Sequence, residues 1–266
     1  MEDLRVSLVQ ADTVWHDPEA NRKMFGELIA PLAGASDLIV LPETFTSGFS
    51  NEAIDRAETM DGPTVAWIRE QAQKLGAVVT GSVQMREGNA VFNRLLWATP
   101  DGKLRHYDKR HLFRMAKEHE RYASGRERMT VELKGWRVCP LVCYDLRFPV
   151  FIRNRFGNEV SDRFDYDLLV FVANWPAARR HAWRTLLRAR TIENLSYAIG
   201  VNRVGQDGNG LDYAGDSVAL DFLGEPQVEC GAVPEVVTTI FSASALAQHR
   251  ERFPAQLDAD EFDIRL

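Results

Sequence analysis

The hydrophobic positions of this chain follow two different periods in turn. Residues 4–10 alternate largely as a half-buried strand does, and residues 37–42 form a short apolar run of strand length. Between them, Asp17-Pro18 supplies an N-cap and a first-turn proline, so a helix is predicted from here to about Leu32. The pattern therefore predicts a strand, a helix and a second strand in succession.

The same alternation continues along the chain. Asp61-Gly-Pro63 predicts a helix that ends at Leu75-Gly76, and residues 77–83 predict the next strand. Beyond residue 130 the pattern predicts strands over residues 136–143, 167–173 and 197–202, helices over residues 148–156, 178–195 and 243–250, and a β-rich stretch over residues 215–240. No linker, repeat or low-complexity block interrupts these elements, so we expect one domain over residues 1–266.

Two segments differ from this simple alternation. Residues 91–98 and 104–107 flank Thr99-Pro-Asp-Gly102, whose Pro-Asp-Gly is a turn signal, and they predict an antiparallel hairpin. Residues 109–128 are highly charged and carry no sustained period, which predicts a long loop. Long loops in compact domains are usually functional. The whole pattern indicates an α/β fold with a mixed sheet and one functional loop.

Composition and charge exclude several partners. The chain has 266 residues and a formal net charge of −6, without a Lys/Arg stripe interleaved with aromatic residues, so nucleic acid is not an expected partner. Its apolar runs, such as residues 167–173, are far shorter than the ~20 residues that cross a bilayer, so no membrane segment is expected. Cys139, Cys143 and Cys230 have no paired spacing and no leader precedes them, which favours the reducing cytoplasm.

The sequence also lacks the motifs of several enzyme classes. It contains no Gly-x-Ser-x-Gly elbow, no His-Glu-x-x-His and no phosphate-binding or dinucleotide-binding glycine motif. Residues 207–212 superficially resemble a calcium loop but lack the distal glutamate, so a glycine-rich turn is the better interpretation. The six histidines are scattered, and neither a metal site nor a cofactor is expected.

Three reactive side chains stand where a predicted strand gives way to a loop. They are Glu43 after Leu-Pro42, Lys109 after Tyr-Asp108 and Cys143 after Leu-Val142. Ligands of open α/β sheets bind at such strand ends. Taken singly, each residue has an ordinary interpretation as a solvated glutamate, a surface lysine or a core cysteine.

Together the three segments resemble the catalytic motifs of the nitrilase superfamily of carbon–nitrogen hydrolases, in the same order and spacing. The resemblance rests on Leu-Pro-Glu43, Tyr-Asp-Lys109-Arg-His-Leu-Phe113 and Leu-Val-Cys143-Tyr-Asp-Leu-Arg-Phe-Pro149, and it extends over nearly the whole chain. It implies an αββα sandwich with mixed sheets that forms a homodimer, and an activity that releases ammonia from a small-molecule amide or nitrile. The chain looks most similar to the bacterial omega-amidase branch, whose substrates are 2-oxoglutaramate and 2-oxosuccinamate.

The resemblance also implies a role for each residue of the trio. Cys143 would attack the substrate and form a thioester, and Glu43 would act as general base and then as general acid. Lys109 and the backbone N–H of Tyr144 would hold the oxyanion of the tetrahedral intermediate. The three side chains would together supply a nucleophile, a proton carrier and a cation.

A second glutamate is expected in the loop that follows the lysine motif. Glu118 and Glu120 are both candidates, and the spacing to Gly125 favours Glu118. Its expected task is to orient Lys109 and the substrate amide. The alternative interpretation is a glutamate on a solvated, charged loop.

Further residues are expected to line the substrate pocket by the same resemblance. Trp175, with Asn174 beside it, and Phe113 are the candidates, although a tryptophan in the core is an ordinary alternative. Arg147 has two interpretations with equal support, because it could bind a substrate carboxylate or pair with Asp145 to hold the nucleophile turn.

Several other functions remain open at this point. A nitrilase or an N-carbamoyl amidohydrolase would use the same Glu-Lys-Cys set with a different pocket. An inactive interaction protein could retain the fold. A papain-like Cys/His hydrolase would require a histidine as base, for which His106 and His111 are the candidates.

Overall fold

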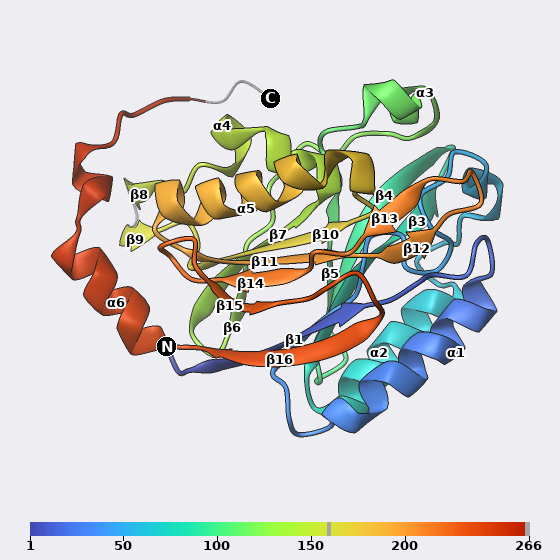
Figure 1. Ribbon diagram of the computed structural model, residues 1–266, viewed down its shortest axis with the longest axis horizontal. Helices are drawn as coiled ribbons and strands as arrows, with labels where there is room; N and C mark the ends of the chain where they lie inside the picture. The colour runs from blue at the N-terminus through green and yellow to red at the C-terminus, as the bar shows by residue number, and fades with distance from the viewer. Residues whose placement is uncertain (159–160, 264–266) are drawn as a thin grey trace.

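Two six-stranded mixed sheets pack face to face in the computed structural model, which describes residues 1–158 and 161–263 (Figure 1). The first sheet has the order β16-β1-β2-β3-β4-β5, formed by Glu235–Phe241, Leu4–Gln10, Leu38–Val40, Val78–Glu87, Ala90–Ala98 and Leu104–Asp108. The second has the order β15-β14-β11-β10-β7-β6, formed by Pro226–Glu229, Val218–Leu220, Tyr197–Asn202, Leu168–Ala173, Trp136–Val142 and Val131–Leu133. Two small ribbons pair β8 (Phe156–Asn158) with β9 (Ser161–Phe164) and β12 (Val204–Gln206) with β13 (Asp212–Ala214).

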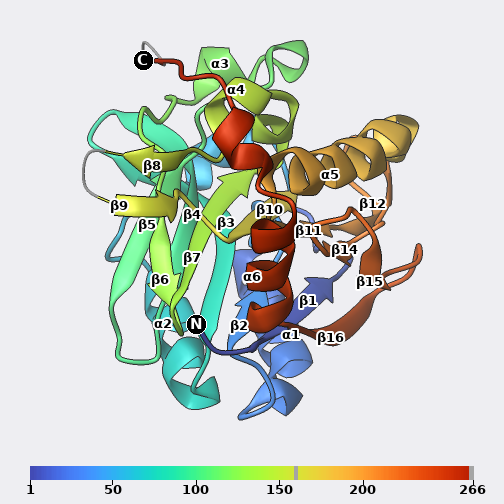
Figure 2. The same ribbon diagram turned by 90° about the vertical axis from the view of Figure 1, so that its left-hand side faces the viewer.

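Helices cover the outer faces of the two sheets (Figures 1 and 2). The α-helices are α1 (Pro18–Ile29), α2 (Pro63–Leu75), α3 (Glu118–Arg121), α4 (Pro149–Ile152), α5 (Arg180–Asn194) and α6 (Ala243–Arg252). The 3₁₀ helices of the described residues are η1 (Ala30–Leu32), η2 (Ala53–Arg56), η3 (Arg114–Ala116), η4 (Cys143–Arg147), η5 (Ala177–Arg179) and η6 (Ala255–Asp258). Helices α1 and α2 lie on the first sheet, and α5 lies on the second. The expected αββα sandwich of mixed sheets is confirmed.

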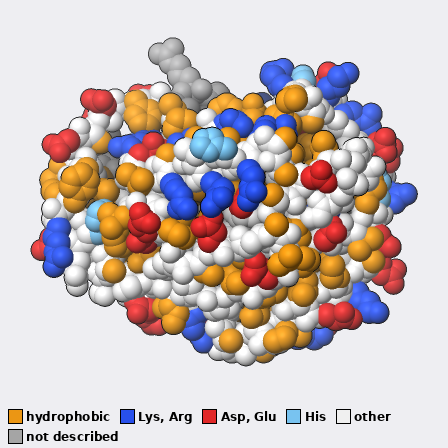
Figure 3. All heavy atoms as spheres, viewed as in Figure 1, with side chains coloured by type: hydrophobic (Ala, Val, Ile, Leu, Met, Phe, Trp, Pro, Cys, Tyr) orange, Lys and Arg blue, Asp and Glu red, His pale blue; other side chains and the backbone are white. Residues whose placement is uncertain are grey.

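The strand period of two explains why the core extends over both faces of a sheet. In β2, Leu38 and Val40 belong to the cluster between the sheets, whereas Ile39 points the other way into the cluster beneath α1 and α2. Successive side chains of a strand face opposite sides of the sheet, so a continuous apolar run is buried on both faces. The outer face of α5 is largely polar, and Arg184 and Arg188 of this helix both approach Glu229 of β15. Basic, acidic and hydrophobic side chains are interspersed over the face of the molecule drawn in Figure 3.

The strand directions bring several strand ends to one side of the molecule. Strands β1, β2 and β3 run parallel, and so do β7, β10 and β11. Strand β5 runs antiparallel to β4, which runs antiparallel to β3, so β5 ends at the same edge as β3. The carboxyl ends of β2, β5, β7 and β10 therefore lead into Glu43, Lys109, Cys143 and Asn174.

Local sequence signals placed most of the helices correctly. The Asp17 carboxylate accepts a hydrogen bond from the Ala20 N–H at 3.0 Å and caps α1 as predicted. The last predicted turn of that helix is 3₁₀ from Ala30, next to Pro31, whose missing N–H cannot continue the α-helical ladder. Gly76 ends α2 in the left-handed conformation at φ 62°.

Two predicted elements were wrong. Residues 109–128 were predicted to be a loop without helical structure, yet η3 and α3 lie within them, because single helical turns are too short to show a period. Residues 148–156 were predicted to be a helix, but α4 ends at Ile152. The Asn154 side chain then donates to the Asn194 carbonyl at 3.0 Å and ties the chain down in a non-helical form before β8.

Candidate active site

Glu43 is fixed by polar contacts at the shared edge of the two sheets. It is fully buried, and its Oε1 accepts from Lys109 Nζ at 3.0 Å and from Asn93 Nδ2 at 2.8 Å. Its Oε2 accepts from the backbone N–H of Asn174 at 2.7 Å. These charge-assisted bonds come from both sheets and hold the carboxylate in one orientation.

Lys109 lies between two carboxylates. Its Nζ is 3.0 Å from Glu43 Oε1 and 3.0 Å from each carboxylate oxygen of Glu118. The ammonium also lies 5.2 Å from the centre of the Phe49 ring. Burial lowers the pKa of Lys109, but the two carboxylates outweigh burial and raise that pKa well above its ordinary value. The side chain is therefore a fixed cation.

The second glutamate at this cluster is Glu118. It is the first residue of α3, it is fully buried, and besides Lys109 its Oε2 accepts from the Phe113 N–H at 2.6 Å. Glu120 is exposed to solvent. Burial raises the pKa of the Glu118 carboxyl, with the charge of Lys109 opposing that shift. The geometry thus selects Glu118, and its part in the reaction stays a prediction.

The spacing from Glu118 to Gly125 has a structural reason. The Gly125 N–H donates to the Lys109 carbonyl at 3.0 Å, which pins the end of the loop to the end of β5. A Cβ at position 125 would lie 2.1 Å from the Asp108 carbonyl oxygen, so only glycine fits there. This hydrogen bond fixes the end of the loop that contains Glu118 next to Lys109.

Cys143 occupies a strained turn directly after β7. It is the first residue of η4, with φ at 43°, a left-handed conformation that is costly for a residue with a Cβ. Its Sγ lies 4.0 Å from the Asn174 carbonyl oxygen. Burial and the negative charge of Glu43 raise the pKa of the Cys143 thiol well above its ordinary value, against the opposing charge of Lys109. The resting group is therefore a thiol, not a thiolate.

Asp145 holds the turn that carries Cys143. This buried carboxylate accepts from the Val142 N–H at 3.0 Å and from the Tyr107 hydroxyl at 2.8 Å. It also accepts from the His111 N–H at 3.0 Å and lies 2.7 Å from His111 Nδ1. The same side chain thereby ties the nucleophile turn to the segment around Lys109.

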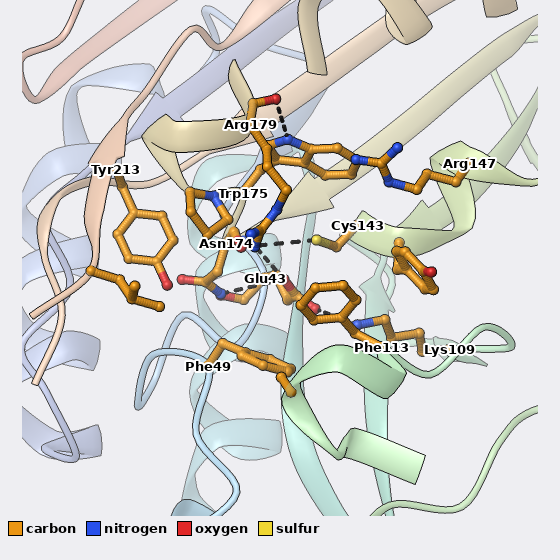
Figure 4. A pocket seen from close by; sticks show the side chains of 14 residues that line it. Glu43, Phe49, Lys109, Phe113, Cys143, Arg147, Asn174, Trp175, Arg179 and Tyr213 are labelled. Carbon is orange, nitrogen blue, oxygen red and sulfur yellow. Dashed lines mark hydrogen bonds and ion pairs between the residues drawn. The ribbon is translucent and has the colours of Figure 1, made fainter. Parts of the chain in front are cut away.

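A pocket opens above this cluster and encloses about 500 Å³, including the solvent at its mouth (Figure 4). Its walls come from the ends of both sheets and from the loops that follow them. The lining residues are Glu43, Phe49, Lys109, Phe113, Ala116, Cys143, Tyr144, Arg147, Asn174, Trp175, Pro176, Arg179, Leu211 and Tyr213. All of the predicted substrate-binding residues thus line one pocket with the predicted trio.

Asn174 and Trp175 are fixed by their own polar contacts. The Asn174 side chain donates to the Glu43 carbonyl at 2.7 Å and to the Thr44 hydroxyl at 2.9 Å. The Trp175 N–H donates to Asn202 Oδ1 at 2.8 Å, and its indole N–H donates to the Arg179 carbonyl at 2.9 Å. Both residues are rigid parts of the pocket wall.

The predicted pairing of Arg147 with Asp145 does not occur. The four contacts of Asp145 come from other residues, as described above. The Arg147 guanidinium instead lies 4.9 Å from the centre of the Trp175 ring, at the pocket. The interpretation in which Arg147 binds a substrate carboxylate stays a prediction.

Comparison with known proteins identifies the family. The model of the carbon–nitrogen hydrolase family matches residues 5–250. This chain is a carbon–nitrogen hydrolase. The resemblance of its three strand-end motifs to the nitrilase superfamily is confirmed by this match and by the shared fold.

Individual carbon–nitrogen hydrolases resemble this one over their full length. The chain is 46% identical to omega-amidase YafV of Yersinia enterocolitica, covering 98% of this chain and 99% of that protein. It is 31% identical to the 2-oxoglutaramate amidase of Bacillus subtilis, covering 94% and 95%. The crystal structure of XC1258 from Xanthomonas campestris, a CN-hydrolase superfamily protein with an arsenic adduct in the active site, matches with a TM-score of 0.98 and 67% identity, covering both chains fully.

Some residues that line the carbon–nitrogen hydrolase pocket, or that support its lining, could not be found from the sequence. Asn93, which holds Glu43, lies inside β4 without any flanking motif. Arg179 was visible only as one half of a basic pair, and Leu211 and Tyr213 only as neighbours of a glycine-rich turn. The remaining unpredicted lining residues are Phe49, Ala116 and Pro176.

Neither candidate histidine lies where a cysteine hydrolase would need its base. His111 is bound to Asp145 and stacks on Phe148, with ring centres 3.8 Å apart. His106 belongs to β5 and is not among the residues that line the pocket. Within residues 1–158 and 161–263 there is no group of three potential metal ligands, and no helix is long and apolar enough to cross a membrane.

Proposed function

We propose that this carbon–nitrogen hydrolase cleaves the terminal amide of short dicarboxylate monoamides, notably 2-oxoglutaramate and 2-oxosuccinamate, to the dicarboxylate and ammonia. The observation that carries the proposal is the buried Glu43–Lys109–Glu118 cluster, of which Glu43 and Lys109 line one pocket together with Cys143. The full-length similarity to an omega-amidase and to a 2-oxoglutaramate amidase supports the substrate class.

The first half of the reaction forms a thioester. Because the Cys143 thiol is protonated at rest, Glu43 takes its proton as the sulfur attacks the amide carbon. The amide oxygen becomes an oxyanion, which Lys109 and the Tyr144 N–H stabilise. When the intermediate collapses, the C–N bond breaks, and the nitrogen leaves as ammonia with the proton that Glu43 received.

The second half returns the enzyme to its starting state. Glu43 is again a carboxylate, and it takes a proton from a water molecule that attacks the thioester carbon. The second tetrahedral intermediate uses the same oxyanion donors and collapses by breaking the C–S bond. Glu43 returns the proton to sulfur, so the products are the carboxylic acid and a regenerated Cys143 thiol.

Glu118 acts in this scheme by fixing the position of Lys109. Both of its oxygens lie 3.0 Å from Nζ, and its hydrogen bond from the Phe113 N–H keeps the carboxylate in this position when substrate binds. An oxyanion donor contributes most when it is already in place, because no reorganisation is then needed during the reaction. Trp175, Asn174 and Phe113 form the rigid wall against which the carbon chain of the substrate rests.

One assay tests the proposed substrate class. Ammonia release is measured with 2-oxoglutaramate, a simple aliphatic nitrile and an N-carbamoyl amino acid, with the same enzyme preparation. We expect turnover of 2-oxoglutaramate at a kcat/KM at least about 10²-fold above that of the other two. A preference for the nitrile or the carbamoyl compound would replace the proposal with a nitrilase or an N-carbamoyl amidohydrolase. No turnover of any of them would favour an inactive interaction protein.

Substitutions of Glu43 and His111 distinguish a glutamate general base from a histidine general base. Glu43→Gln keeps the shape but cannot accept a proton, so kcat should fall by about 10³-fold. His111→Ala removes a ring that already holds Asp145, so kcat should stay within about tenfold of the wild type. Both are measured by ammonia release from 2-oxoglutaramate. A dead His111→Ala beside an active Glu43→Gln would support the papain-like alternative.

We also infer that the protein acts in the cytoplasm as a homodimer. Three buried cysteines without a disulfide support a reducing compartment. Dimerisation is an expectation from the superfamily resemblance.

A further inference from the structure

Two arginines at the pocket have no carboxylate partner in the part of the chain that the structure describes. Arg147 ends η4 and Arg179 ends η5, and both line the pocket. Among residues 1–158 and 161–263, no carboxylate lies within 4.0 Å of either guanidinium, and neither guanidinium donates a hydrogen bond. By contrast, Arg94 of β4 in the first sheet pairs with both Glu87 and Asp108.

Each of these guanidiniums rests on an aromatic ring of the pocket. Arg147 lies 4.9 Å from the Trp175 ring centre, and Arg179 lies 5.2 Å from the Phe113 ring centre. A guanidinium that packs on a ring keeps its five N–H donors in its own plane, free for a further partner. Figure 4 shows the Arg179 side chain extending from η5 toward Asn174 and Cys143. The donors are thus held in place and directed at the pocket.

The charges that line the pocket are unbalanced. Glu43 is its one acidic lining residue, whereas Lys109, Arg147 and Arg179 are basic. Lys109 is already neutralised by Glu43 and Glu118, both 3.0 Å away. The two glutamates and the three cations leave a formal charge of +1, and among the described residues the two guanidiniums are the cations without a carboxylate beside them, in a pocket whose other walls are mostly aromatic or apolar. A carboxylate is the group that a pair of guanidinium forks binds best.

We infer that Arg179, together with Arg147, forms a carboxylate site and selects amides that carry a carboxylate over neutral amides of the same length. The inference rests on the proposed function, since it concerns the far end of the substrate whose amide reaches Cys143. Arg179 is the new specificity-determining residue, because it lines the pocket and its side chain extends from η5 toward Asn174 and Cys143 (Figure 4). Its backbone carbonyl, which holds the Trp175 indole, is unaffected by side-chain substitution.

A matched pair of substrates tests the inference. Succinamate and butanamide differ only in a carboxylate that replaces a methyl group. For Arg179→Ala we expect kcat/KM for succinamate to fall about 10- to 100-fold, mostly through KM, as the loss of charged hydrogen bonds predicts. Activity on butanamide should change less than about threefold. Arg147→Ala should also lower kcat/KM for succinamate. The kcat/KM of Arg179→Lys should lie between those of Arg179→Ala and the wild type, because lysine keeps the charge without the planar fork of donors.

Arg184→Ala is the matched control, because it removes an arginine of α5 that pairs with Glu229 on the outer surface. It should leave both substrates unchanged. Equal losses on succinamate and butanamide in Arg179→Ala, or no loss on either, would overturn the carboxylate site. Failure of the wild type to release ammonia from any amide would instead overturn the proposed function.

Binding to the inactive protein separates the two outcomes further. Calorimetry with Cys143→Ala and succinate, the product dicarboxylate, should give a dissociation constant that rises at least tenfold in Cys143→Ala/Arg179→Ala. This readout does not depend on turnover. Equal affinity of the two proteins for succinate would contradict the site even if the wild type is an active amidase.

Discussion

Replacement of Cys143 by alanine is expected to lower ammonia release from 2-oxoglutaramate by at least about 10⁴-fold, because removal of a covalent nucleophile leaves only binding and oxyanion stabilisation. The fold should survive. Alanine removes only the sulfur and meets the same left-handed φ of 43° that cysteine already tolerates. The midpoint of thermal unfolding should therefore stay within a few degrees of the wild type, measured beside the rate.

Cys230→Ala is the control for this substitution. Cys230 is also buried, but it lies far along the chain from the strand-end motifs and does not line the pocket. It should retain wild-type activity. If Cys143→Ala still released ammonia at a rate near that of the wild type, the thioester mechanism would have to be abandoned.

Lys109→Ala is expected to damage both stability and activity. The substitution leaves Glu43 and Glu118, both fully buried, without the cation that lies 3.0 Å from each. Loss of one member of a buried ion cluster typically costs about 3–5 kcal/mol of the free energy of unfolding. Loss of the oxyanion donor should lower kcat, calculated per folded molecule, by about 10²- to 10³-fold. Urea unfolding and ammonia release measure the two effects.

A second substitution separates the charge effect from the loss of packing. In Lys109→Ala/Glu118→Gln one of the two orphaned charges is gone, so part of the lost free energy of unfolding should return while activity does not. Glu120→Gln, on the exposed side of α3, should change neither quantity. If the double variant were no more stable than Lys109→Ala, the buried carboxylates would not be the cause of the loss.

The elements that were predicted correctly depend on signals within a few residues. The cap at Asp17, the left-handed Gly76 and the turn at residues 99–102 each act through contacts of their own segment. The alternation of Leu38, Ile39 and Val40 likewise reports the two faces of β2 without knowledge of its neighbours. Short helical turns such as α3 carry no such signal, which is why residues 109–128 were taken for a loop.

The site was predictable where its residues belong to a recognisable motif, and not elsewhere. Glu43, Lys109 and Cys143 stand in motifs that resemble a family, and the choice of Glu118 followed from its distance to Gly125. Asn93 is important because it donates to Glu43, 50 residues away in the sequence, and Arg179 because its side chain lines the pocket. No local pattern records such contacts, so they required the structure.

The single carboxylate of Glu43 bridges the two sheets. It follows β2 of the first sheet, yet its Oε2 accepts from Asn174, 131 residues later, at the end of β10 in the second sheet. The proposed general base and the proposed nucleophile belong to different sheets, because Glu43 follows β2 of the first sheet and Cys143 follows β7 of the second. The site therefore forms only when the two sheets pack together. We expect a folding intermediate in which both sheets are formed but not yet packed on each other to be inactive.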